Sequence, residues 1–206
     1  MRKTLQNLII ASAFALAAPS FAQARGILEH NITTPLSTPI KIDIVYSEDM
    51  QHRANNLPES NKLKGLGVTR GARSGFAGNG YYGEQSLEHL AKSLKRKMTN
   101  KFKKTGISVS DDAPTTMRIT IVDAKNNRPT GNQLSNQPGL SYTSFGLGGA
   151  TLNAELLDQN GNSLGTMTYS YFETDIDLSA QFSGMWHDAN RSFRFFAKKA
   201  AKTLAN

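Results

Sequence analysis

The sequence contains no cysteine, so its 206 residues can form neither a disulfide bond nor a thiolate metal site. Thiol catalysis is excluded for the same reason, and we expect no lipid attachment through an N-terminal thiol. Acidic residues are also scarce, with 16 Asp and Glu against 24 Lys and Arg and a formal net charge of +8. Without disulfides the fold must rest on its hydrophobic core, and the length suits one domain.

A long apolar run occurs only at the N-terminus. Arg2 and Lys3 give a positive start, residues 8–18 are almost entirely apolar, and Ala22-Gln23-Ala24 offers a small-x-small cleavage site. The run is shorter than the roughly 20 residues that a membrane span requires. Residues 1–24 are therefore predicted to be a cleavable signal peptide, with a retained anchor as the alternative. We expect a soluble periplasmic protein or, alternatively, a secreted one.

Periodicity divides the rest of the chain into a leader and one domain. Residues 25–39 have turn chemistry and no period, which indicates a flexible leader. Residues 40–206 are predicted to be a single domain with long loops at 47–83 and 124–149. Alternation of apolar and polar residues predicts strands at 40–46, 107–109, 117–123, 152–156 and 167–171, the last two joined by a hairpin turn at Asn160-Gly161.

Two segments have helical periodicity. Apolar residues of 87–102 and 186–204 recur at steps of three and four, and Gly106 follows the first segment where a left-handed residue often ends a helix. The order is strand, helix, four strands, helix. This order predicts an α/β (α+β) two-layer sandwich, with about five mostly antiparallel strands and both helices packed on one face.

No catalytic or metal-binding signature is present, and we expect no catalytic residue, metal or cofactor. The four histidines, His30, His52, His89 and His187, lack the spacing of a helical metal site. Residues 78–83 match the letters of a dinucleotide fingerprint, but no strand precedes them, so no nucleotide cofactor is expected.

A glycine-rich loop before a helix can still bring backbone N–H groups to an anion. Together with two upstream arginines it forms an anion-binding candidate, which comprises Arg70, Arg73, Gly78, Gly80 and Gly83. A second candidate is an aromatic contact patch at Tyr142 and Phe145, for which packing on the sheet is the alternative. The lysine-rich faces of both predicted helices could bind nucleic acid or lipid headgroups, with simple solvation as the alternative.

Several segments of the chain resemble those of a known family. They are the helix 87–102 followed by Lys104-Thr105-Gly106-Ile107, the strand 117–123, and the segments 156–161 and 168–172 before the last helix. The family that they resemble is the YajG lipoprotein family, whose members are small α/β envelope proteins of Gram-negative bacteria, similar in plan to the CsgG-like and TolB amino-terminal domains. The resemblance covers about residues 40–204 and implies a non-enzymatic envelope protein, but no functional residues. The chain departs from the family because it lacks the acylated cysteine, which puts outer-membrane tethering in doubt.

Three functions remain open. The preferred one is a non-catalytic binding or assembly role in the cell envelope, with an envelope protein or an anionic polymer as partner and an unknown oligomeric state. The second is an enzyme acting on an envelope or extracellular polymer, which would need carboxylates brought together from Asp43, Glu48, Asp123, Glu155, Glu173, Asp175 and Asp177. The third is a secreted cationic protein that binds anionic surfaces.

Overall fold

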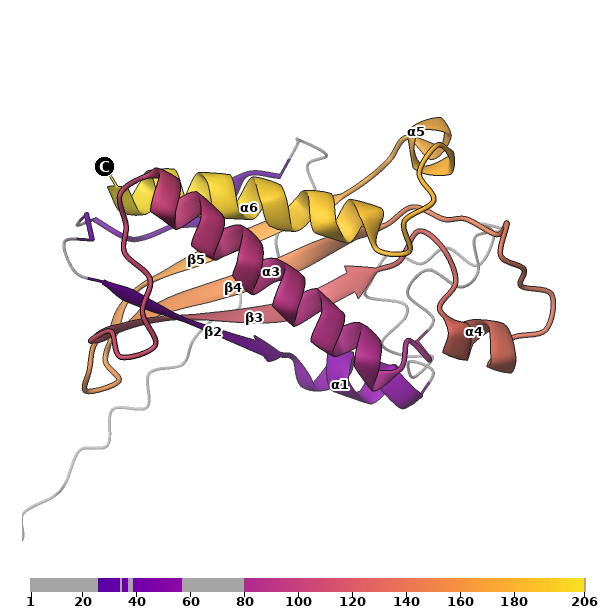
Figure 1. Cartoon of the computed structure of the whole chain (residues 1–206), viewed down its shortest axis with the longest axis horizontal. Helices are drawn as coiled ribbons and strands as arrows, with labels where there is room; N and C mark the ends of the chain where they lie inside the picture. Colours follow the sequence, from indigo (N-terminus) through magenta and orange to yellow (C-terminus); the bar gives the residue numbers. More distant parts are fainter. Residues whose placement is uncertain (1–25, 34, 37–38, 57–79, 206) are drawn as a thin grey trace, which may run out of the picture.

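The chain folds into two layers, a five-stranded sheet and a pair of long helices on one of its faces (Figure 1). The computed structural model describes residues 26–33, 35–36, 39–56 and 80–205. The sheet order is β1-β5-β4-β3-β2, with β1 at Leu28–His30, β2 at Ile40–Tyr46, β3 at Thr115–Lys125, β4 at Gly149–Leu157 and β5 at Ser163–Phe172. The predicted α/β fold class is thereby confirmed.

Alternation along the strands places one apolar row under the helices. In the register of the sheet, Ile42 lies beside Met117, Leu156 beside Met117, and Ala154 beside Met167. All of these side chains are buried. The β2–β3 pair is parallel and the other pairs are antiparallel. Parallel neighbours require a crossover connection, which the helices between β2 and β3 supply.

The two long helices are α3 (Glu84–Lys104) and α6 (His187–Ala205), which pack on each other and on the same sheet face. α3 lies over β2, and α6 lies over β4 and β5. The apolar residues that recur at steps of three and four in the two predicted helices are buried. They include Leu94 and Phe102 in α3 and Phe193 and Phe196 in α6. Alanines at 197 and 200 are also fully buried. Their small side chains let the backbone of α6 come close to its neighbours.

The end of α3 has the geometry expected from Gly106. Gly106 adopts φ 82°, Ile107 N–H donates to Phe102 O at 3.0 Å, and Gly106 N–H donates to Lys103 O at 3.4 Å. This is a Schellman ending, completed by the burial of both Phe102 and Ile107. The turn redirects the chain from the helical layer toward the sheet.

Several local expectations differ from the structure. Residues 107–109 form no strand. Val109 makes one isolated parallel bridge with Ile40, the first residue of β2, in which Ile40 N–H donates to Ser108 O and Ser110 N–H donates to Ile40 O. The fifth strand is instead β1, which lies inside the predicted leader and pairs with β5. Its three residues are too few to show a period.

Three short helices were not predicted, two of them in the expected loops at 47–83 and 124–149 and one between the last predicted strand and the last helix. They are α1 (Glu48–Asn55), α4 (Gly131–Asn136) and α5 (Ile176–Ala180). Each begins at a side-chain cap, from Ser47, Thr130 and Asp175 respectively. Each has too few apolar residues for helical periodicity to appear, so the capping residue was the one available signal.

No helix in the described part of the chain is long and apolar enough to cross a membrane. The predicted signal peptide, residues 1–24, lies outside the described residues.

Replacement of Gly106 by alanine tests the helix ending. The Cβ would meet no atom within 4 Å, so the cost comes only from the left-handed backbone. We expect Gly106→Ala to lower the free energy of unfolding by about 1 kcal/mol, measured by urea denaturation. Gly131→Ala is the matched control, since Gly131 also has open space but no positive φ. An equal effect of both substitutions would contradict this assignment.

Candidate functional site

A group of buried polar residues lies on α1, α4, α5, the start of α6 and the segment after β3. Figure 1 shows these elements toward one end of the sheet. The fully buried polar residues described there are Arg53, Asn126, Asn127, Gln133, Ser179 and Asp188. Buried polar groups are costly unless they are hydrogen-bonded. The contacts of these residues therefore show how the loops and short helices at this end of the sheet, called the loop end below, are held together.

Arg53 of α1 is fully buried and is surrounded by three oxygen-bearing side chains. Its Nη2 lies 2.6 Å from Asp123 Oδ1, its Nε lies 2.8 Å from Asp49 Oδ2, and its Nη1 donates to Tyr82 Oη at 2.7 Å. Burial lowers the pKa of Arg53, but Tyr82, Asp123 and Asp49 outweigh this effect and raise it. Burial raises the pKa of Tyr82, whose phenol therefore stays neutral. The cluster joins α1 to the end of β3.

Asn127 and Asp188 bind each other twice. Asp188 N–H donates to Asn127 Oδ1 at 2.8 Å, and Asn127 Nδ2 donates to Asp188 Oδ2. The same Oδ2 accepts from Ser179 Oγ at 2.9 Å and from Gly148 N–H at 3.1 Å. One carboxylate oxygen at the start of α6 thus joins α5, the end of β3 and the beginning of β4.

Gln133 connects α4 to the residues that precede α3. Its side chain completes a capping box with Thr130, accepts from Asn126 Nδ2 at 2.7 Å, and donates to Gly80 O at 2.9 Å. Gly80 adopts φ 79°, and a Cβ there would lie 2.1 Å from Asn56 O. Glycine at position 80 is therefore required by backbone conformation and by space.

The anion-binding candidate is only partly described. Gly83 is the N-terminal cap residue of α3, and its N–H donates to Ala54 O at 2.8 Å. Gly80 lies beside Asn56, as noted above. Arg70, Arg73 and Gly78 lie outside the described residues, so this site stays a prediction.

Arg128 ties two loops together. Its Nη1 donates to Thr143 O at 3.0 Å, its Nη2 to Ala180 O at 2.9 Å, and its Nε to Phe182 O at 3.2 Å. The guanidinium also lies 5.3 Å from the centre of the Phe145 ring. Since its main donors are engaged by carbonyl oxygens, Arg128 holds the loops in place and does not offer a free cation.

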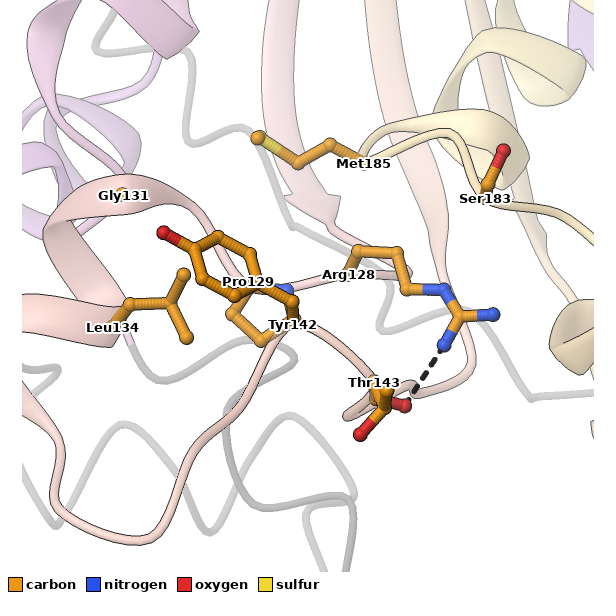
Figure 2. Close-up of a pocket in the computed structure, with 8 residues that line it drawn as sticks. All are labelled: Arg128, Pro129, Gly131, Leu134, Tyr142, Thr143, Ser183 and Met185. Carbon is orange, nitrogen blue, oxygen red and sulfur yellow. Dashed lines mark hydrogen bonds between the residues drawn. The ribbon is translucent and has the colours of Figure 1, made fainter.

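A cavity of about 510 Å³ lies beside Arg128. Figure 2 shows side chains from three segments around it, and the lining residues are Arg128, Pro129, Gly131, Leu134, Tyr142, Thr143, Ser183 and Met185. Tyr142 is 86% exposed and Met185 is 38% exposed. Of the predicted aromatic pair, Tyr142 lines this cavity, while Phe145 lies against the guanidinium of Arg128. That the pair forms a contact surface stays a prediction.

The carboxylates considered for an enzyme do not converge on the cavity, although Glu173, Asp175 and Asp177 are neighbours linked by backbone N–H donors. Asp43 pairs with Arg118, Asp123 with Arg53, and Glu173 with Arg191. Asp175 caps α5, and the others are Glu48 and Asp177 in short helices and Glu155 on β4. Within the described ranges, no three His, Asp or Glu side chains gather as a metal-ligand group. No paired acid and base is assembled in the cavity, whose lining contains no carboxylate.

Sequence reasoning missed Asn127, Arg128 and Asp188. Asn126-Asn127-Arg128 directly after a strand, ahead of Pro129, was a local signal for a structured loop. Asn127 and Asp188 lie 61 positions apart, and Arg128 reaches carbonyl oxygens up to 54 positions away, so nothing in the local sequence indicates these partners.

The buried Arg53–Asp123 pair allows a test of this architecture. We expect Asp123→Ala to lower the free energy of unfolding by about 3 kcal/mol, because it removes one anion from a buried guanidinium. Joint replacement, Arg53→Met with Asp123→Leu, should recover most of the loss in a double-mutant cycle measured by urea denaturation.

The exposed pair Asp43–Arg118 is the control, since its side chains are 36% and 52% exposed. Asp43→Ala should cost less than about 1 kcal/mol. If Asp123→Ala were no more costly than Asp43→Ala, the structural importance assigned to Arg53 would be wrong.

Neither a family model nor a curated protein sequence matches this chain. The resemblance to the YajG family therefore stays a prediction. Among solved structures, the chain is similar to the PelC dodecamer from Paraburkholderia phytofirmans, with a TM-score of 0.43, 8% identity, and coverage of 87% of this chain and 97% of that one. A single-substitution variant of the same PelC dodecamer gives a TM-score of 0.41 and 9% identity, with coverage of 84% and 95%.

Proposed function

We propose that this protein is exported and acts in the periplasm of a Gram-negative bacterium as a non-catalytic binding protein of the cell envelope. The N-terminal 24 residues support export through their charge, apolar run and cleavage site. The cavity beside Arg128 is the proposed binding site. It is the single observation on which the binding role rests.

The cavity suits an apolar or aromatic group of a partner. Pro129, Leu134, Tyr142 and Met185 supply an apolar lining, and Thr143 and Ser183 supply hydroxyl groups at its margin. Binding sites typically combine such a lining with a few polar groups that orient the ligand. Arg128 already donates to four carbonyl oxygens, so an anionic group would gain little there.

Hydrogen bonds next to the cavity also support binding. Its walls are tied to the buried contacts of Asn127 and Asp188, and Met185 O accepts from Asn127 N–H at 2.7 Å. A preorganised site loses less conformational entropy when a partner docks. Exposed tyrosine is enriched among residues that contribute most to protein interfaces.

Export is tested by expressing the full chain in a Gram-negative host. We expect osmotic shock to release a product that lacks residues 1–24, identified by its intact mass. Ala24→Asp should block cleavage and leave the full-length chain with the membranes, since signal peptidase needs a small residue there. Recovery of uncleaved wild-type chain in the cytoplasm would contradict the proposal.

Partner binding is tested by capture from envelope extract with the mature chain as bait, followed by titration of the captured partner. Met185→Asp should weaken binding about tenfold or more, because it places a charge in the apolar lining. Leu164→Asp is the matched control, since Leu164 is also an exposed apolar residue but belongs to β5 and not to the cavity. Equal losses in both variants, or no difference from wild type, would exclude the cavity as the site.

A further inference from the structure

The seam between α3 and α6 contains a half-buried lysine held only by neutral groups. Lys97 Nζ lies 2.6 Å from Ser93 Oγ and 2.6 Å from Asn190 Oδ1, and Ser93 Oγ donates to the same Asn190 oxygen at 2.5 Å. No carboxylate forms a salt bridge with Lys97 in the part of the chain that the structure describes. Its ammonium charge is therefore not neutralised by the fold.

Two guanidinium groups add to this charge. Burial lowers the pKa of Lys97 to about 8, with further contributions from Arg96 of α3 and Arg194 of α6. Arg96 and Arg194 are exposed, and neither pairs with a carboxylate among the described residues. Arg194 lies four residues after Asn190 on α6, and Asn190 Oδ1 is 2.6 Å from Lys97 Nζ, so Arg194 lies on the face of α6 that meets Lys97. Neighbouring cations disfavour the charged form of Lys97, and a bound anion would offset this effect.

The helices around the seam continue the positive charge. On α3 and α6 the other basic residues are Lys92, Lys95, Lys101, Lys103, Lys104, Arg191, Lys198, Lys199 and Lys202. The acidic residues of the two helices are Glu84, Glu88 and Asp188, of which Asp188 is buried. Three of the basic residues pair with carboxylates, Lys92 with Glu88, Lys95 with Asp111 and Arg191 with Glu173. The remaining excess of positive charge on the two helices attracts polyanions.

We propose that the α3–α6 seam, centred on Lys97, Arg96 and Arg194, binds the sulfate or carboxylate groups of an anionic polysaccharide. This site is independent of the cavity proposed above, which is built from loops and an apolar lining. The proposal concerns a second ligand of the same protein.

The surface chemistry favours a polysaccharide over a membrane or a single-stranded nucleic acid. Among the described residues, none of the exposed large hydrophobic side chains belongs to α3 or α6. A helix that binds in a membrane interface inserts such side chains, and single-stranded nucleic acids stack on aromatic ones. The aromatic residue beside Arg194 is Phe195, which is partly buried, and its ring lies 5.5 Å from the Arg194 guanidinium. The seam therefore offers mainly charged, hydroxyl and amide groups, which suit repeating oxyanions.

Ser93 and Lys97 also have the composition of a nucleophile and its base. Ser93, however, is 6% exposed and lies in the middle of α3, where backbone N–H groups bond to helix carbonyls. Backbone donors for an oxyanion intermediate are therefore missing at Ser93. The geometry supports anion binding rather than acyl transfer.

The test is a titration of the mature chain with heparin, which is sulfated, and with polygalacturonate, which carries only carboxylates. We expect binding of at least one of them to weaken steeply as salt rises from about 0.05 to 0.5 M, because screening shortens the range of charge attraction. Arg194→Gln should weaken it about five- to tenfold, as expected for loss of one charge-assisted contact.

Lys41→Gln is the matched control. It removes the same charge from an exposed position of β2, between Ile40 and Ile42, which face the helices. We expect less than about a twofold change. An equal effect of Lys41→Gln and Arg194→Gln would overturn the assigned site, as would the absence of binding to either polysaccharide.

Two further measurements test whether the polysaccharide binds at Lys97 and whether it is preferred over lipid vesicles and DNA. The ¹⁵Nζ signal of Lys97 should report a higher pKa in the presence of the bound polysaccharide, because an anion offsets Arg96 and Arg194 while Ser93 and Asn190 stay neutral. Vesicles of phosphatidylglycerol and duplex DNA serve as competing polyanions. Tighter binding to either of them than to both polysaccharides would overturn the proposal.

Discussion

The paired contact between Asn127 and Asp188 organises the loop end of this protein. This contact joins the start of α6 to the segment after β3. Asp188 Oδ2 also accepts hydrogen bonds from Ser179 Oγ and Gly148 N–H. Asn127 and Asp188 are both fully buried, so water cannot replace a lost partner. The cavity walls on either side of Arg128 have a defined shape because this contact joins α5 to the loop before β4.

The two proposed binding sites depend on opposite physical properties. The cavity beside Arg128 is lined mainly by apolar groups, and its one cation is occupied by carbonyl oxygens. The α3–α6 seam contains three cations without carboxylate partners among the described residues and no exposed large hydrophobic side chain. One protein thus presents an apolar surface made by loops and a charged surface made by helices, suited to ligands of different chemistry.

Much of the fold could be predicted because its signals are local. The two long helices and the strands β2, β3, β4 and β5 each have enough residues to show a period, and the turn at Gly106 depends on a single backbone conformation. β1, α1, α4 and α5 were missed since each is too short for a period to appear. The expected strand at 107–109 failed because alternation alone does not ensure a partner along the whole segment.

The sequence by itself determined the two-layer class, the apolar stripes that face each other, and the excess of positive charge on the helices. Tertiary structure alone decided which polar groups meet. Arg53 contacts Asp123, which lies 70 positions away in the sequence, and Lys97 contacts Asn190, which lies 93 positions away. The physical reason is that hydrophobic periodicity depends on neighbours three or four residues away, whereas a buried hydrogen bond depends on where two distant segments are brought together by packing.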